Sequence, residues 1–550
     1  MLRDAVIVGL QFALCVYVGS WSRAPAADVV KTQPARACAA HRPQVHASLL
    51  PMLNASASVL EQRVVPRAWS SECRSVLQSV ANDLREGAVH ARAHRHPVAE
   101  QHCSFDRISA SKEANQWAFR PRSFGYEAKP LATEHATIAF VVHMTNTPSE
   151  AQLERLLSRV VRSDHLYFFS VDAAPGAART AKARALVEAL MARLAKQRGY
   201  AAGLPWWGVD SSVDVVYTGP GLMRAQVATW RALVAAGVPH WDSVINITPS
   251  DYPIKTVEWM SRYLAYHGAI SWTESFLQNA HWATGRHLHD VVVECPGEPC
   301  GPHPPSAAPS AAVNAARQRA EAHATRRAGR GADGAEATCS GFVFHDAAAR
   351  KPPLAPSMSF GGSAFSALHR DFVASTVACL APLLDGGAER EAIDGAEGLA
   401  TAEAVGDAAY CASVRTFYRY YESTFAAEEL FVQTALFNGP FCRDTPNSGG
   451  NLRWVAWDAA DKEQRQGLEN SNDLKAKRPG FVTEQYAARH FFPKRAACDA
   501  RCVEEYLPLF ARKFHAVRYP KAVLAADAAA KRWASQTDWA VVFKEKGAMR

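Results

Sequence analysis

Residues 137–143 read TIAFVVH, and this stretch decides the fold because its apolar centre, residues 138–142, has the pattern of a strand that is buried on both faces. Similar runs predict further strands, at residues 165–172 (HLYFFSVD), 213–217 (VDVVY) and 243–247 (SVINI). Helical periodicity lies between the strands, at residues 149–162, 179–198 and 222–236. Strands that alternate with helices predict an α/β domain whose mainly parallel sheet is flanked by helices on both faces.

The amino-terminal segment predicts entry into the secretory pathway. Residues 5–21 (AVIVGLQFALCVYVGSW) form an uncharged apolar run that is at the short end for a membrane span. We interpret residues 1–22 as a signal anchor, and the alternative is a signal peptide that is cleaved near Ala26. Either interpretation places the rest of the chain in the lumen. The anchor predicts a single-pass type II protein of the Golgi or ER membrane.

The composition changes along the chain and suggests its domain organisation. Residues 23–132 show little strand periodicity and are expected to form a luminal stem, followed by a globular domain at residues 133–525 and a tail at residues 526–550. Two low-complexity segments interrupt the globular domain, near residues 296–337 and 385–408. The first is rich in Ala, Pro, Arg and Gly, and the second is strongly acidic, so neither can bury a core and both are expected to be exposed insertions.

Charge and cysteine content exclude some classes of function. The net charge of +8 is small for 550 residues, and no zinc-finger spacing or long basic helix is present, so a nucleic-acid partner is not expected. Eleven of the twelve cysteines follow the apolar run, and an oxidising lumen would favour disulfides between them. Cys295/Cys300 and Cys498/Cys502 are close pairs, but no histidine pattern accompanies them, which favours disulfides over a zinc site. The pairing stays open.

Two segments combine a buried run with residues suited to a ligand site. Residues 243–256 (SVINITPSDYPIKT) lead from a strand into a turn that contains Asp251. Ligands of open parallel sheets bind beyond the carboxyl ends of the strands, although a helix cap is the alternative role for Asp251. Residues 360–372 (FGGSAFSALHRDF) contain Gly361 and Gly362, which allow a backbone to approach a ligand closely.

A pair of adjacent glutamates is the candidate for acid–base chemistry. Residues 414–442 (VRTFYRYYESTFAAEELFVQTALFNGPFC) place Glu428 and Glu429 near the expected start of a helix. One positioned carboxylate can take the proton from a hydroxyl group as that hydroxyl attacks. Adjacent side chains on a helix point in different directions, so at most one of the two can face a pocket. A solvated helix surface is the alternative.

A basic pair near the end of the chain is suited to phosphate. Residues 509–514 (LFARKF) place Arg512 beside Lys513, which combines a planar fork of donors with a mobile point charge. An ordinary surface pair is the alternative interpretation. Residues 451–458 (NLRWVAWD) contain Arg453, which is either a site residue or a structural arginine.

Taken in chain order, these segments resemble the core-2/I-branching and peptide xylosyltransferase family, glycosyltransferase family 14, and most of all its xylosyltransferases. The family counterparts are INLSxxDYP, GGSDWFVL, PAESFFHTVL, NLRxxNW and FARKF, and the resemblance covers roughly residues 135–520. It implies a GT-A-like fold with residues 133–525 as the catalytic domain. It also implies a UDP-sugar as donor and a protein or glycan as acceptor.

The resemblance also assigns roles to individual residues. Glu429 is the expected catalytic base, and one base with direct displacement implies inversion at the anomeric carbon. The expected pocket residues around it are Glu428, Asp251 and Arg453. The expected donor-binding residues are Val142, Asp172, Gly362, Ser363, Ala364, Phe365, Arg512 and Lys513. The sequence has no Asp-x-Asp pair, and the family neutralises the donor diphosphate with cations, so neither a metal nor another cofactor is expected.

The sequence departs from the xylosyltransferases at Ala364 and Phe365, where those enzymes have an Asp-Trp pair at the donor sugar. The most specific expectation is a protein O-xylosyltransferase that moves xylose from UDP-xylose to serine hydroxyls. One alternative is a β-N-acetylglucosaminyl- or glucuronosyltransferase that acts on glycans. An alternative of another class is an inactive, membrane-tethered carbohydrate-binding or scaffold protein.

Overall fold

The computed structural model describes residues 131–144, 149–173, 177–213, 219–277, 290–295, 341–346, 360–384, 408–445, 450–455, 508–514 and 519–542, with a few single-residue gaps, and scattered residues near 57–85, at 215 and near 482–492. All of them belong to the compact unit Arg42–Arg550, and the other unit, Met1–His41, lies outside the described residues. The expected insertions at residues 296–337 and 385–407 also lie outside them.

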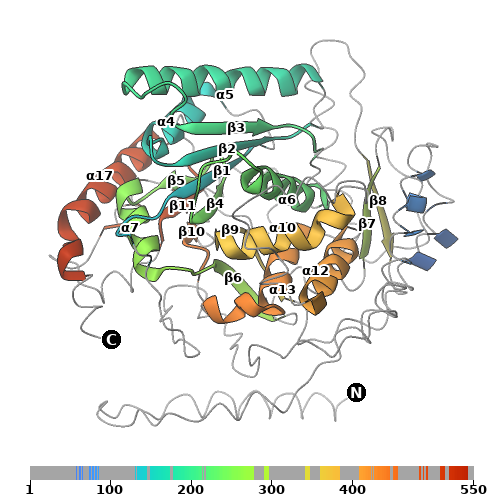
Figure 1. Ribbon diagram of the computed structural model, residues 1–550. Coiled ribbons are helices and arrows are strands. Elements are labelled where there is room, and N and C mark those ends of the chain that lie inside the picture. Colours follow the sequence, from blue (N-terminus) through green and yellow to red (C-terminus); the bar gives the residue numbers. More distant parts are fainter. Residues whose placement is uncertain are drawn as a thin grey trace, which may run out of the picture. The chain divides into compact units, whose positions relative to one another are not determined.

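Within the described residues, the central sheet has six strands and is mixed (Figure 1). In spatial order they are β3 (Trp206–Asp210), β2 (Leu166–Val171), β1 (Ile138–Met144), β4 (Ser243–Ile247), β9 (Phe360–His369) and β6 (Trp272–Leu277). The first four pair in parallel, whereas β9 pairs antiparallel with both β4 and β6. The predicted α/β class is confirmed. The predicted parallel arrangement is found for the four strands from β3 to β4, and not for β9 and β6.

The third strand of the sheet is not where the sequence pattern predicted it, so the prediction of a strand at residues 213–217 is wrong. The strand is β3, which reads WWGVD, and the backbone at Val213 and Val215 has no regular structure. β3 is an edge strand whose residues all remain partly exposed, so it lacks the continuous apolar run of the inner strands. Val215 instead donates its backbone N–H to the carboxylate of Asp172 (2.8 Å), which follows β2.

Helices cover both faces of the central sheet (Figure 1). On one face lie α4 (Glu150–Val160), α5 (Ala177–Gln197), α7 (Val257–His267) and α17 (Pro520–Gln536), and on the other lie α6 (Gly221–Val234), α10 (Arg370–Leu384), α12 (Ala408–Tyr421) and α13 (Phe431–Phe437). The strand pleat separates the two cores: Ile138 and Phe140 of β1 point into the first, and Ala139 and Val141 into the second. Burying alternate residues on opposite faces explains why every residue of β1 except His143 is apolar.

A second, three-stranded sheet joins segments that are far apart in the sequence. It consists of β5 (Tyr252–Pro253), β10 (Arg453–Val455) and β11 (Phe510–Arg512). β11 lies in the middle, antiparallel to β5 and parallel to β10. A separate antiparallel pair, β7 (Asp290–Cys295) and β8 (Gly341–Asp346), flanks the first low-complexity segment. Two 3₁₀ helices, η5 (Ala427–Glu429) and η6 (Pro440–Asp444), border α13.

The carboxyl-terminal helix is part of the packed domain. α17 runs across residue 525, where the sequence suggested the start of a tail, and Trp533 is buried against Trp259 of α7. Of the helices that the structure describes, none is long and apolar enough to cross a membrane. The expected anchor at residues 1–22 lies outside the described residues.

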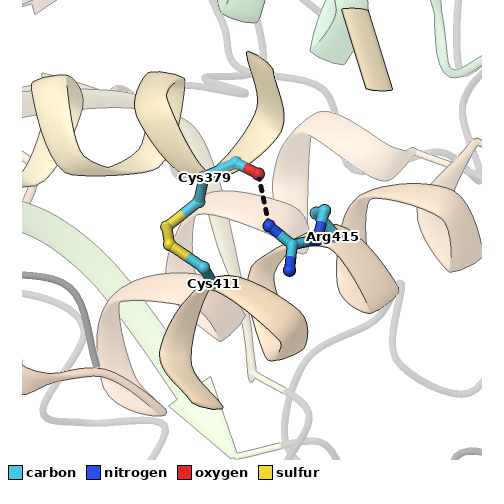
Figure 2. Close-up of a disulfide and its surroundings, with 3 residues drawn as sticks. All are labelled: Cys379, Cys411 and Arg415. Carbon is cyan, nitrogen blue, oxygen red and sulfur yellow. Dashed lines mark hydrogen bonds between the residues drawn. A yellow bond between two sulfur atoms is a disulfide. The ribbon is translucent and has the colours of Figure 1, made fainter. Parts of the chain in front are cut away.

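A disulfide between Cys379 and Cys411 joins α10 to α12 (Figure 2). Arg415 of α12 donates to the carbonyl oxygen of Cys379 (3.1 Å), so the two helices are linked at the same point by a covalent bond and a hydrogen bond. The two cysteines are 32 residues apart and bracket the acidic segment at residues 385–407. Closing a loop of this length stabilises a folded chain by roughly 3–4 kcal/mol. The expectation of disulfides is met at this pair.

Candidate active site

The candidate site lies at the carboxyl edge of the parallel strands. From β1 the chain continues to β2 and β3 on one side, whereas β4 lies on the other side of β1 (Figure 1). Such a reversal of strand order opens a crevice beyond the carboxyl ends of the two central strands, where open α/β sheets bind their ligands. β1 ends near His143, and β4 leads into the turn that carries Asp251.

A buried ion pair connects this turn to the second sheet. Asp251 Oδ2 accepts hydrogen bonds from the backbone N–H of Thr248 (2.6 Å) and from its hydroxyl group (2.8 Å). Asp251 Oδ1 lies 2.9 Å from Arg453 Nε, and both side chains are almost completely buried. Arg453 Nη2 also donates to the carbonyl oxygen of Asn246 in β4 (2.6 Å). The predicted pocket residues Asp251 and Arg453 are therefore direct partners.

β9 bulges towards the same edge of the sheet. Thr273 pairs with Ser366 and Ser275 pairs with Gly362, so one residue of β6 faces three residues of β9. These three, Ser363, Ala364 and Phe365, are partly exposed, whereas the residues on both sides of them are buried. Asn246 holds the bulge by donating to the Ala364 carbonyl (2.8 Å) and accepting from the Ser366 N–H (2.6 Å). Three of the predicted donor-binding residues therefore form the bulge itself.

Glycine is required where the bulge begins. A Cβ atom on Gly362 would lie 1.7 Å from the carbonyl oxygen of Glu274, which no side-chain adjustment can relieve. Gln433 of α13 completes this contact region by donating to the Ser363 carbonyl oxygen (2.7 Å) and to the Thr273 hydroxyl group (3.3 Å). Gly362 therefore serves the close approach of β6 to β9, in addition to lying next to the predicted donor site.

Two guanidinium groups contact the aromatic ring of the bulge. The guanidinium carbons of Arg453 and Arg512 each lie 4.2 Å from the ring centroid of Phe365. The parallel pairing of β10 with β11 brings these arginines together, although they are far apart in the sequence. Burial lowers the pKa of Arg453 to about 10, an effect that Asp251 opposes and Arg512 strengthens, so Arg453 stays charged at neutral pH.

This pair of like charges still has free hydrogen-bond donors. Among the described residues, Arg453 Nη1 and Arg512 Nε and Nη1 have no hydrogen-bond partner. Lys513 follows directly and is partly exposed, so a third cation lies at the end of β11. Neighbouring cations with unused donors form a site that favours an anion with several oxygen atoms, such as a diphosphate.

The two glutamates precede α13 rather than lying on it. They end η5, which follows Ala426 in the left-handed conformation (φ 51°), a backbone state that costs an alanine free energy and is concentrated at functional sites. Glu428 is buried (8% exposed), whereas Glu429 is partly exposed. Desolvation raises the pKa of Glu429 well above its usual 4.5, repulsion from Glu428 and Glu274 adds to the shift, and Arg512 opposes it. A raised pKa suits a general base that works near neutral pH.

Some predicted donor-binding residues lie apart from the arginine pair. The Val142 side chain is fully buried in the core, so only its backbone can face a ligand. The Asp172 carboxylate accepts the N–H of Val215 and holds the chain after β3. The next residue of β1, His143, is instead affected by the charges of the ion pair: burial and the Arg453 charge lower its pKa to about 4, with Asp251 opposing, so its imidazole is neutral. Strand alternation at Val142 was the signal that could have identified His143.

No metal centre is recognisable within the described residues, since no three His, Cys, Asp or Glu side chains are grouped to hold an ion. The predicted site residues that do meet come from several parts of the chain. They are Asp251 after β4, Gly362, Ser363, Ala364 and Phe365 in β9, Glu428 and Glu429 in η5, Arg453 in β10 and Arg512 and Lys513 at the end of β11.

Comparison with known proteins finds a family that matches part of this domain. Residues 138–297 match the family model described as Core-2/I-Branching enzyme. This segment runs from β1 to the end of β7 and includes the parallel strands, His143 and the Asp251 turn. This part of the chain is therefore similar to the Core-2/I-branching enzymes, the family that the sequence motifs resemble. The matched segment ends before β9, η5, β10 and β11.

Among curated proteins, the chain is similar to xylosyltransferase 1 of several mammals. The dog protein is 24% identical over 159 residues, which cover 29% of this chain and 15% of the relative. The human and chimpanzee proteins are each 23% identical over 159 residues, with the same shares of the two chains. The similarity thus spans about 15% of the length of the curated relatives that the chain matches.

Proposed function

We propose that this protein is an inverting glycosyltransferase of GT-A-like fold that transfers a sugar from a UDP-sugar to a hydroxyl group without a metal or other cofactor. The observation that carries the proposal is that Arg512, which contacts Phe365 of the β9 bulge, also acts electrostatically on Glu429. A general base and a diphosphate-binding cation must lie on either side of the anomeric carbon for direct displacement. The match of residues 138–297 to the Core-2/I-Branching enzyme model supports a sugar transferase.

The reaction follows from the roles of these side chains. Arg512 and Lys513 bind the diphosphate, and the carboxylate of Glu429 accepts the proton of the acceptor hydroxyl. The hydroxyl oxygen forms a bond to the anomeric carbon while the bond from that carbon to the diphosphate oxygen breaks and UDP leaves with its electron pair. The cations stabilise the charge that develops on UDP, and attack from the opposite side inverts the anomeric centre.

The donor sugar has two candidates. Xylose transferred to serine is the first, because the curated relatives are xylosyltransferases. N-acetylglucosamine or glucuronic acid transferred to a glycan is the second. It is favoured by the β9 bulge, where Ala364 and Phe365 next to the arginine pair replace the Asp-Trp pair of the xylosyltransferases.

We place the enzyme in the Golgi or ER lumen as a type II membrane protein, with residues 1–22 as its anchor. The apolar run at residues 5–21 and the Cys379–Cys411 disulfide support this location, since disulfides persist in oxidising compartments. Its partners are then the UDP-sugar, a protein or glycan acceptor and the membrane, with no nucleic acid.

A donor screen tests the proposal. The purified full-length protein is incubated in EDTA with UDP-xylose, UDP-N-acetylglucosamine, UDP-glucuronic acid or UDP-galactose, with and without acceptor peptides and glycans, and UDP release is measured. We expect turnover of one donor in EDTA. Turnover only after Mn²⁺ or Mg²⁺ is added would contradict metal independence. No turnover with any donor would favour an inactive carbohydrate-binding or scaffold protein.

A further inference from the structure

The tyrosine that follows Asp251 belongs to a polar network that the proposed reaction does not use. Tyr252 is the first residue of β5 and is 3% exposed. Its hydroxyl group donates to Asp527 Oδ1 of α17 (2.9 Å) and accepts from Arg159 Nε of α4 (3.2 Å). Arg159 Nη2 also lies 2.5 Å from Asp527 Oδ2, which completes a three-way contact between β5, α17 and α4. Burial raises the pKa of Tyr252, so its hydroxyl group keeps the proton that it donates.

The same tyrosine contacts the strand that carries the proposed diphosphate ligands. Tyr252 pairs with Ala511 of β11, and the two strands are antiparallel. Its ring also packs against Phe514, with 5.4 Å between the ring centroids. Ala511 directly precedes the Arg512–Lys513 pair and Phe514 directly follows it. Tyr252 therefore contacts the chain on both sides of the basic pair.

Strand alternation directs the two faces of β11 to different partners. Ala511 and Tyr252 are buried in one apolar cluster together with residues of α17. Consecutive side chains of a strand point to opposite faces, so Arg512 points to the other side. There its guanidinium carbon lies 4.2 Å from the ring centroid of Phe365. β5 and α17 thus form the back of the strand whose front carries the cation.

The segment around β5 is held by the same two helices at further points. On the α4 side, Gln152 donates to the carbonyl oxygens of Pro249 (2.9 Å) and Phe514 (3.4 Å). On the α17 side, Nζ of Lys255 lies 3.3 Å from the ring centroid of Trp533. Both helices pack against β5 (Figure 1). A shift of either helix would therefore be transmitted through β5 to β11.

We propose that Tyr252 is a positioning residue for the donor site: its hydroxyl group, held by Asp527, fixes β11 from behind and thereby aims the guanidinium group of Arg512 at the diphosphate. The inference rests on the transfer reaction proposed above. Among the described residues, Arg512 Nε and Nη1 have no hydrogen-bond partner. The direction of this planar fork determines how many phosphate oxygens it can bind. α17 then contributes to donor affinity through Asp527 without touching the donor.

Removal of one hydroxyl group tests the proposal. Tyr252→Phe keeps the ring against Phe514 and removes the contact with Asp527. It is expected to weaken the binding of UDP and of inorganic pyrophosphate by about tenfold, a loss within the range for substitutions along a contact network. Both affinities are measured by isothermal titration calorimetry in EDTA. Unchanged affinities, or a loss for UDP without a loss for pyrophosphate, would overturn the proposal.

A matched tyrosine separates positioning from stability. Tyr167 of β2 is also buried, and its hydroxyl group donates to the carbonyl oxygen of Val160 (2.8 Å) and accepts from the backbone N–H of Arg162 (2.7 Å). Tyr167→Phe is expected to lower the melting temperature about as much as Tyr252→Phe does and to leave the UDP affinity unchanged. An equal loss of UDP affinity in the two variants would indicate a general effect of lost stability and would overturn the proposal.

Substitutions of the carboxylate partner provide a second test and a rescue. Asp527→Ala removes the acceptor of the Tyr252 hydroxyl group and is expected to weaken UDP binding as Tyr252→Phe does. Asp527→Asn keeps an acceptor oxygen and is expected to retain most of the affinity. If Tyr252→Phe does not fold, the contrast between these two variants tests the same contact. Wild-type UDP affinity in Asp527→Ala would overturn the proposal.

The binding measurements also separate the inference from the proposed function. Normal sugar transfer together with unchanged UDP affinity in Tyr252→Phe and Asp527→Ala would refute the positioning role alone. If wild type binds pyrophosphate but not UDP, the nucleotide donor is refuted, and the loss for pyrophosphate still tests the positioning role. If wild type binds neither anion, both the diphosphate site and the positioning role are wrong.

Discussion

Glu429→Gln is expected to lower kcat for sugar transfer by about 10²–10⁴-fold, because a glutamine amide cannot accept the proton of the acceptor hydroxyl. The KM for the donor is expected to change little, since the proposed diphosphate ligands are Arg512 and Lys513 and not Glu429. Glutamine has nearly the same shape as glutamate and removes a charge that desolvation disfavours, so the variant should fold. Steady-state rates of UDP release with saturating acceptor measure the effect.

Two further variants make this test specific. Glu188→Gln changes an exposed glutamate on α5 (49% exposed side chain) and is expected to leave kcat unchanged. Glu428→Gln changes the buried neighbour and is expected to cause a much smaller loss than Glu429→Gln. A larger loss in Glu428→Gln would transfer the role of base to that residue. Full activity of Glu429→Gln would refute both possible roles of Glu429, the transfer of the proton and the positioning of the substrate.

Asp251→Asn is expected to reduce the free energy of unfolding by roughly 3–5 kcal/mol, because it leaves the buried guanidinium of Arg453 without its counter-charge. The remaining positive charge would lie beside Arg512, which already disfavours the charged form of Arg453. Urea unfolding followed by circular dichroism measures the change.

The design includes a surface control and a rescue. Asp371→Asn alters an exposed aspartate of α10 (68% exposed side chain) and should change the free energy of unfolding by no more than about 0.5 kcal/mol. Adding Arg453→Met to Asp251→Asn removes both charges and should recover part of the loss, since apolar replacement of a whole buried pair is often neutral. A wild-type midpoint for Asp251→Asn alone would show that the pair does not stabilise the turn.

The long buried strands and the helices between them could be predicted from the sequence. β1, β2 and β4 are mainly apolar and fully buried, and their bounds in the structure lie within two residues of those predicted. β3 was misplaced because an edge strand buries less and is less apolar. The antiparallel position of β9 and the sheet of β5, β10 and β11 depend on pairings between distant segments, which local periodicity does not encode.

The site shows the same division between local and non-local information. Recognisable sequence motifs contain Asp251, Glu429, Arg453 and Arg512. The residue types in these motifs and the order of the motifs along the chain were sufficient to select the four residues. Glu274 stands in no such motif, and its place opposite the bulge depends on the register of β6 with β9. His143 was overlooked in favour of Val142, although the pleat of β1 turns consecutive side chains to opposite faces.

Binding of UDP in the presence of EDTA, measured by isothermal titration calorimetry, tests whether side-chain cations hold the diphosphate without a metal. We predict binding at one site per chain, which Arg512→Met should weaken by about 10–100-fold, the loss expected for charge-assisted hydrogen bonds to a phosphate. The control Arg184→Met, at an exposed arginine on α5 (53% exposed side chain), should leave the affinity unchanged. Two results would contradict a cation-based diphosphate site at this edge of the sheet. One is UDP binding that requires an added divalent metal, and the other is UDP binding that is equally strong in the Arg512→Met variant.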